Sequence, residues 1–432
     1  MKWSYALRFW LQEHLVQPVA VRALTTVERL RRGVAYNPLD RRYRADPYPL
    51  YRELRERDPF HRSRLAGGWV LTRYEDVGAV LRDGRFLADE RKLPGFDRQR
   101  AQLLKAGLIE EGEQLSPSML RSDPPDHTRL RGLVSKAFTP RTVEALRPRV
   151  EAIVQELLDR AAANGGMDAI RGLAYPLPVI VIAELLGVPA EDRERFKRWS
   201  DDAVSALGIG RLDDFIRSRD AARELRAYFA QVAEERRREP REDLLSALLA
   251  AEEEGDQLTI DEVFATCILL LVAGNETTTN LIGNGLLALL RHPDQLALLR
   301  DDPSLIESAV EELLRYDSPV QLTSRFVLED VELNGHAIAA GQPAIALIGA
   351  ANRDPEAFAE PERLDITRQD NRHLSFGHGI HYCLGAPLAR LESQVAFLAL
   401  LERFPNLRLA GGRLEWGDNL VLRGLKSLPV AF

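Results

Sequence analysis

The segment FGHGIHYCLG, residues 376–385, holds Cys383, one of only two cysteines in the 432-residue chain. Three glycines and two histidines share this segment: Gly377, Gly379, Gly385, His378 and His381. A thiolate that binds a metal needs backbone N–H groups directed at its sulfur, and glycine lets the backbone approach closely. The pattern therefore indicates a loop built around a sulfur ligand.

A non-enzymatic metal- or haem-binding module is one alternative for this part of the chain. His373, His378, His381 and Cys383 fall within eleven residues. Structural zinc sites, however, usually recruit closely spaced pairs of ligands from two segments, and the sequence contains no C-x-x-C. The spacing therefore disfavours a zinc module.

A long helix is predicted over residues 259–291, with Thr259 as its N-cap and Glu262 as the capping-box partner. At about 1.5 Å per residue it extends about 50 Å, roughly the width of a domain, so we expect it to be central. Its run 267–273 is apolar all round and includes the second cysteine, Cys267, which is predicted to be a small core residue.

Gly274, Asn275, Glu276 and Thr277 bring polar groups into the buried middle of this helix. One interpretation is a local bend with satisfied side chains, because glycine beside polar residues often marks such irregularities. The other is that an acid and a hydroxyl in an apolar setting pass protons to a bound ligand. The helix by itself leaves both interpretations open.

The remaining pattern predicts mainly helices with small β-sheets beside them, an α+β arrangement. Helical periodicity dominates residues 120–320 and includes a helix within 149–166 that ends at a pair of glycines. Strands are predicted at 67–74, 324–329, 343–352 and 419–425.

With the long helix beside it, the cysteine loop resembles that of the cytochrome P450 family of haem-thiolate monooxygenases, in its soluble bacterial form. The loop has the family pattern F-x-x-G-x-H-x-C-x-G at Phe376, Gly379, His381, Cys383 and Gly385. AGNETT matches the oxygen-binding segment of the family, with Asn where many bacterial members carry His. The resemblance implies haem b (iron protoporphyrin IX) between the long central helix and the cysteine loop.

Other segments extend the resemblance. EELLR supplies the E-x-x-R motif at Glu312 and Arg315, and PERLD supplies a third member at Arg363, with Leu364 in place of the usual Phe. The resemblance implies that these residues form a buried network supporting the cysteine loop, where such a pair is otherwise usually a solvated surface contact.

The two propionates of haem need charge-assisted partners. DPPDHTRLR resembles the haem-facing helix of the family and supplies His127 and Arg131. Arg325 matches the basic position in the strand beyond E-x-x-R, and His381 is the fourth candidate.

The resemblance implies monooxygenation, which inserts one oxygen atom of O2 into a C–H bond or double bond. Cys383 is then the iron ligand, Thr277 and Glu276 deliver protons, and Ala273 and Gly274 leave room beside the haem. A peroxide-driven peroxygenase is the enzymatic alternative, but such members typically lack the acid–alcohol pair.

The expected substrate is a small, mainly hydrophobic organic molecule, because the family pocket segments are apolar where they are readable. They include residues 86–118 and 200–215. The individual candidates are Leu270, Ala273, Val320, Leu322 and Leu422.

Electrons are expected from a separate ferredoxin and ferredoxin reductase, because the sequence has no flavin or nicotinamide fingerprint. The candidate docking residues, for which simple solvation is the alternative, are Arg121, Arg129, Lys136 and Arg141. A net charge of −7 argues against nucleic acid as a partner.

The chain is predicted to consist of an amphipathic extension, residues 1–37, and a single catalytic domain, residues 38–432. Charged residues interrupt the apolar stretches of the extension, which excludes a transmembrane segment there. Its apolar face is expected to pack on the protein, with weak contact to a membrane surface as the alternative; it comprises Trp3, Leu7, Trp10, Leu11 and Leu15. Two cysteines indicate a reducing compartment, the cytoplasm.

Overall fold

The helices and small sheets predicted from the sequence are present in the computed structural model. It describes residues 17–105, 109, 118–162, 165–205, 212–253 and 258–432. The helices of this part of the chain are α2 (Gln17–Arg32), α3 (Arg41–Ala45), α4 (Tyr48–Arg57), α5 (Tyr74–Arg82), α6 (Phe96–Lys105), α7 (Asp126–Ser135), α8 (Pro140–Glu144), α9 (Arg147–Ala162), α10 (Pro176–Leu185), α11 (Arg193–Val204), α12 (Leu212–Arg238), α13 (Leu244–Glu253), α14 (Ile260–Arg291), α15 (Pro293–Asp301), α16 (Ile306–Tyr316), α17 (Ile348–Ala351) and α18 (Ala386–Arg403). The strands are β1 (Phe60–Ser63), β2 (Gly68–Leu71), β3 (Phe86–Leu87), β4 (Gly166–Asp168), β5 (Thr323–Val327), β6 (Val331–Leu333), β7 (His336–Ile338), β8 (Pro343–Ala346), β9 (Arg408–Leu409), β10 (Glu415–Trp416), β11 (Leu425–Ser427) and β12 (Pro429–Ala431).

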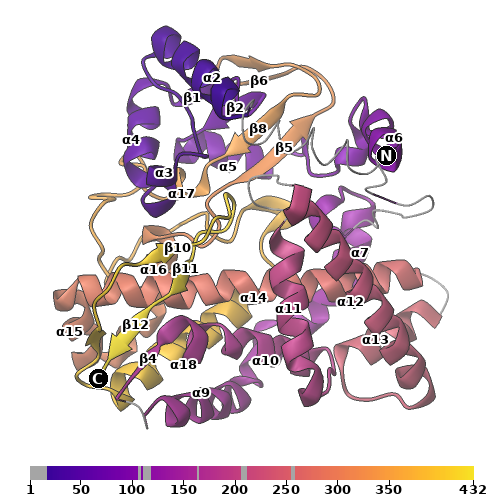
Figure 1. Ribbon diagram of the computed structural model, residues 1–432, viewed down its shortest axis with the longest axis vertical. Helices are drawn as coiled ribbons and strands as arrows, with labels where there is room; N and C mark the ends of the chain where they lie inside the picture. Colours follow the sequence, from indigo (N-terminus) through magenta and orange to yellow (C-terminus); the bar gives the residue numbers. More distant parts are fainter. Residues whose placement is uncertain (1–16, 106–108, 110–117, 163–164, 206–211, 254–257) are drawn as a thin grey trace.

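The long helix α14 is central, as predicted, and it crosses the whole helical part of the molecule (Figure 1). Thr259 Oγ1 accepts from the Glu262 N–H, and the Glu262 side chain accepts from the Thr259 N–H, which completes the capping box. The helix continues through residues 274–277. It packs against α10, α11, α12 and α18, so its middle lies in the main hydrophobic core.

A five-stranded sheet in the order β1-β2-β8-β5-β3 lies beside this helical part (Figure 1). Only β2 and β8 pair in parallel; the other neighbours are antiparallel. The strands predicted at 67–74 and 324–329 correspond to β2 and β5, which confirms both. The sheet thus positions Arg325 of β5.

The other two strand predictions fail in part or in full. In 343–352 the strand β8 gives way to the short helix α17, all of whose residues are buried. The prediction at 419–425 is wrong, because only Leu422 forms an isolated bridge, to Val320, before β11 begins at Leu425. The apolar run 420–422 lies in an irregular segment, where Leu422 is buried at 7% exposed.

The N-terminal helix α2 is attached to the sheet by a buried polar contact. Glu28 Oε2 lies 3.3 Å from His61 Nε2, and Asp58 Oδ2 lies 2.9 Å from His61 Nδ1. Glu28 Oε1 also accepts from the Arg64 N–H at 2.5 Å. The predicted apolar face at residues 3–15 lies outside the described residues. No helix among the described residues is long and apolar enough to cross a membrane.

Candidate active site

The cysteine loop joins the short 3-10 turn η9 (Gly379–His381) to helix α18. Gly377 and Gly379 have φ of +73° and +71°, in the left-handed region that favours glycine. An added Cβ on Gly379 would lie 2.6 Å from the Leu81 carbonyl oxygen. The Cys383 N–H donates to the Phe376 carbonyl at 2.8 Å, which closes the loop.

Residue Cys383 as a whole is exposed to solvent, but many protein atoms surround its thiol group. Burial raises its pKa, and the N–H groups of Gly385 and Ala386 and the charges of Arg131 and Arg390 act in the opposite direction. Backbone N–H groups therefore reach the sulfur, as the glycine pattern predicts. An added Cβ on Gly385 would meet nothing within 4 Å among the described residues, so this side of the glycine is open.

Four basic side chains from three elements gather near this loop. His127 and Arg131 come from α7, Arg325 from β5 and His381 from η9. The two imidazole centroids lie 4.3 Å apart, and the Nε2 atoms of both histidines are buried without a hydrogen-bond partner among the described residues. Arg325 is 8% exposed, and its Nη1 donates only to neutral oxygens of Thr323 and Ser324.

These basic groups repel one another. Burial, and then the charge of Arg131, lower the pKa of His127. Burial, and then the charges of Arg325 and His127, lower the pKa of His381 to about 3. Asp123 is a nearby acid, but it is occupied by the N–H groups of residues 88 and 89. The buried charge of Arg325, next to Arg131 and to two imidazoles with buried Nε2 atoms, is complementary to an anionic ligand.

The middle of α14 carries an acid without a partner. Glu276 Oε2 is buried and makes no hydrogen bond to any residue that the structure describes. Burial, and then the charge of Asp201, raise the pKa of Glu276 to about 7. Thr277 Oγ1 donates to the Ala273 carbonyl at 2.7 Å, and Ala273 itself is exposed although α14 is central. The free side of Gly274 faces Ile182 of α10 at 3.9 Å.

Asn275, which the sequence left without a role, is directed away from these groups. It is 1% exposed, and its Nδ2 donates to Ser200 Oγ at 3.0 Å and to Tyr175 Oη at 3.4 Å. Tyr175 Oη in turn donates to Asp201 at 2.8 Å. Asn275 therefore ties α14 to α11, a contact that only the tertiary structure reveals.

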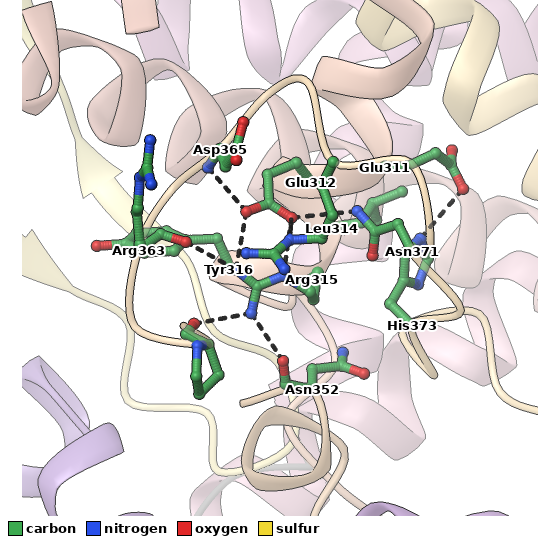
Figure 2. A network of polar contacts seen from close by, with 12 residues as sticks. Glu311, Glu312, Leu314, Arg315, Tyr316, Asn352, Arg363, Asp365, Asn371 and His373 are labelled. Atoms are coloured by element: carbon green, nitrogen blue, oxygen red, sulfur yellow. Dashed lines mark hydrogen bonds and ion pairs between the residues drawn. The ribbon is translucent and has the colours of Figure 1, made fainter. Parts of the chain in front are cut away.

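Glu312 and Arg315 form the predicted buried pair, and both side chains are fully buried. Arg315 Nε and Nη2 donate to Glu312 at 2.7 and 2.8 Å, and its other N–H groups donate to three backbone carbonyls (Figure 2). The assignment of the Arg363 side chain is wrong, because that side chain is 59% exposed and pairs with Glu360. Only the Arg363 carbonyl oxygen joins the network, at 3.0 Å.

The groups that complete the Glu312 site were missed from the sequence. Arg368 Nε and Asn371 Nδ2 both donate to Glu312 Oε2 at 3.1 Å, and the Asp365 N–H donates to Oε1 at 2.9 Å. All three lie on the loop that leads to the cysteine segment; Asp365 and Asn371 are labelled in Figure 2. The sequence gives no periodic signal in this irregular loop that distinguishes Arg368 from Arg363.

The described residues include only some of the predicted substrate contacts. Leu270 and Leu422 are buried, and Val320 and Leu322 are half-buried. The bridge between Val320 and Leu422 brings two of the predicted segments together. Much of 86–118 and 200–215 lies outside the described residues, namely 106–108, 110–117 and 206–211.

The predicted docking residues differ in their pairing. Arg129 donates to Glu262 at the start of α14, and Arg121 lies 2.9 Å from Glu90. Lys136 and Arg141 are exposed and form no ion pair with a described residue.

Within the described part of the chain, no three His, Cys, Asp or Glu side chains are grouped so as to hold a metal ion.

Comparison with known proteins gives extensive matches. Residues 70–409 match the family model described as Cytochrome P450. The chain is 45% identical over 420 residues to the cytochrome P450 monooxygenase PikC of Streptomyces venezuelae, covering 94% of this chain and 97% of PikC. It is 46% identical over 400 residues to the vitamin D(3) 25-hydroxylase of Pseudonocardia autotrophica, covering 89% and 93%.

A solved structure agrees with these matches. Cytochrome P450 PksS, of the bacillaene polyketide synthase of Bacillus subtilis, aligns with a TM-score of 0.84 at 43% identity, over 92% of this chain and 99% of that one. Similarity of this extent covers the helical part, the sheet and the cysteine loop together. The chain therefore belongs to the cytochrome P450 family and is a haem-thiolate monooxygenase that hydroxylates organic substrates.

Proposed function

We propose that Cys383 supplies the thiolate ligand of haem b, iron protoporphyrin IX, and that Phe376, Gly379 and Gly385 shape the loop around it. The N–H groups of Gly385 and Ala386 near the sulfur support this role, because they stabilise negative charge there. The open side of Gly385 is compatible with this role, because no protein atom of the described residues occupies it.

We propose that His127, Arg131, Arg325 and His381 bind the propionates. The single observation that carries the haem assignment is this buried, mutually repelling group with two unpartnered imidazole nitrogens. A carboxylate accepts hydrogen bonds from such nitrogens and offsets the positive charge. The residues present therefore fit the cofactor.

When bound, a thiolate-ligated haem supplies the chemistry of O–O bond cleavage. We propose that Glu276 holds a proton at its unpartnered carboxyl and that Thr277 directs it toward dioxygen. A pKa of about 7 supports this, because the carboxyl is then protonated in a substantial fraction near neutral pH. Small side chains at Ala273 and Gly274 keep this part of α14 accessible.

The net reaction consumes O2, two electrons, two protons and one C–H bond, and it gives one hydroxyl group and one water. We propose a small, mainly hydrophobic substrate, since Leu270, Val320, Leu322 and Leu422 are apolar.

Two electrons come from a ferredoxin and its reductase. Lys136 and Arg141 are exposed and pair with no described acid, which supports docking of an acidic partner.

We propose a cytoplasmic enzyme, because both cysteines are free, as is typical of a reducing compartment. Residues 38–432 are proposed to be one catalytic domain and residues 1–37 an extension. The buried contact between Glu28 and His61 supports close attachment of the described part of this extension.

The function is tested by reconstitution of the purified enzyme with a ferredoxin, its reductase, reduced nicotinamide and a substrate found by its spin-state shift. Isotopically labelled O2 is expected to place one labelled oxygen atom in the product. If hydrogen peroxide without the redox partners gives labelled product at a rate equal to or higher than that with O2 and the partners, the result contradicts the monooxygenase proposal and indicates a peroxygenase.

A further inference from the structure

A second, partly buried ion pair lies directly beside the cysteine loop. Arg390 of α18 donates from Nε to Glu311 Oε1 at 2.6 Å and from Nη2 to Glu311 Oε2 at 2.8 Å. The two side chains are 29% and 28% exposed, so solvent screens this pair less than it screens a surface contact. The two parallel hydrogen bonds fix the plane of the guanidinium group.

The same guanidinium group contacts the cysteine loop at two points. Its central carbon lies 4.5 Å from the centroid of the Phe376 ring, and Nη1 donates to Tyr382 Oη at 3.4 Å. Phe376 also accepts the Cys383 N–H through its carbonyl, and Tyr382 immediately precedes the cysteine. Arg390 therefore contacts two residues of the segment that leads to Cys383, one at its start and one immediately before the cysteine.

His373 also contacts Glu311, at the carboxylate oxygen that accepts from Arg390 Nη2. His373 Nε2 lies 3.2 Å from Glu311 Oε2, and its Nδ1 accepts from the Ser375 N–H at 3.2 Å (Figure 2). Although burial raises the pKa of Glu311, the hydrogen bonds from Arg390 and His373 bring it down to about 2. Glu311 therefore keeps its negative charge at any pH well above 2.

We propose that mutual cancellation of the Arg390 and Glu311 charges keeps the reduction potential of the haem iron unshifted, and that Arg390 is a positioning residue for the cysteine loop. One-electron reduction forms and breaks no bond, and it lowers the charge at the site by one. A pair with no net charge next to the loop is nearly neutral toward this step, whereas either member alone is not. The proposal rests on the assignment of Cys383 as the iron ligand.

The test is an equilibrium redox titration of the purified, haem-loaded protein with dithionite and mediator dyes. Arg390→Gln leaves an unbalanced carboxylate and is expected to lower the potential. Glu311→Gln leaves an unbalanced cation and is expected to raise it. Each change in the reduction equilibrium is expected to be about tenfold, and a tenfold change in a one-electron equilibrium corresponds to about 59 mV.

The double variant Arg390→Gln with Glu311→Gln restores neutrality, so its potential is expected to return close to that of the wild type. Arg390→Lys keeps the charge and provides a second comparison if the glutamine variant does not fold. The matched control is Arg372→Gln, because Arg372 pairs with Asp370 at the surface, where the two side chains are 84% and 78% exposed.

Shifts of opposite sign that cancel in the double variant support the inference. Shifts of the same sign, or potentials equal to that of the control, overturn it, because a purely structural pair has no reason to show charge-dependent signs. Loss of the thiolate signature of the carbon monoxide complex in Cys383→Ser is expected. Retention of that signature overturns the ligand assignment instead, so the two failures are distinguishable.

Discussion

Removal of either member of the Glu312–Arg315 pair is expected to destabilise the enzyme strongly, and by different amounts. Truncation of one partner of a buried ion pair costs about 3–5 kcal/mol, because an uncompensated charge remains. In Arg315→Ala, Glu312 keeps Arg368 as a counter-charge at 3.1 Å, together with the Asn371 amide and the Asp365 N–H. We therefore expect a cost near the lower end, about 3 kcal/mol.

In Glu312→Ala, the fully buried Arg315 loses the only carboxylate it contacts among the described residues. The donors of Asp365, Arg368 and Asn371 lose their acceptor at the same time. The expected cost is therefore near the upper end, about 5 kcal/mol. Because the loop that carries these donors leads to the cysteine segment, haem content is expected to fall in the same order.

The assay is urea unfolding followed by circular dichroism, with haem content measured on the purified variants. Arg363→Ala is the matched control, since its side chain is exposed, and its effect is expected to stay within about 0.5 kcal/mol. Arg315→Ala with the stability and haem content of Arg363→Ala would refute the reasoning. So would a smaller cost for Glu312→Ala than for Arg315→Ala.

Three further outcomes follow from the site and from the N-terminal contact. Thr277→Ala is expected to fold and bind haem but to uncouple nicotinamide oxidation from product, with peroxide rising; unchanged coupling would contradict the role of this hydroxyl. Product formation is expected to fall as pH rises through about 7, where Glu276 loses its proton, and an identical pH profile in Glu276→Gln would argue against that acid. Although burial raises the carboxyl pKa values and lowers that of His61, their mutual hydrogen bonds leave Glu28 and Asp58 with lowered pKa values and His61 with a raised one. The α2 contact is thus present above the ordinary carboxyl pKa and below the ordinary His pKa, and it weakens as pH falls through the lowered values or rises through the raised one. Hydrogen exchange of residues 17–32 across pH checks this, and pH-independent protection would contradict it.

The sequence predicted those parts of the site that depend on local chemistry. A glycine with positive φ leaves a sequence signature, so Gly377 and Gly379 indicate the shape of the cysteine loop. A capping box does the same at Thr259 and Glu262. A spacing of three residues in a helix places Glu312 and Arg315 on one face. The capping box and the Glu312–Arg315 pair are both present in the structure as predicted.

The sequence failed where long-range contacts decide the outcome. The choice of Arg368 over Arg363 depends on the path of an irregular loop, in which no periodicity indicates which side chain points inward. Residues 420–422 form an apolar run of the kind found in strands, but among the described residues this segment has strand-type pairing only in the isolated bridge between Leu422 and Val320. The contact between Glu28 and His61 joins residues 33 positions apart and has no local pattern.

The central claim is that Cys383 provides a thiolate to the haem iron, and the carbon monoxide complex of the reduced protein tests it most directly. The wild type and Cys267→Ser are expected to show the strongly red-shifted Soret band of a thiolate-ligated haem, since Cys267 is a buried core residue. Cys383→Ser is expected to fold and to lose that band. Retention of the red-shifted band in Cys383→Ser, or its absence from the wild type, would contradict the account.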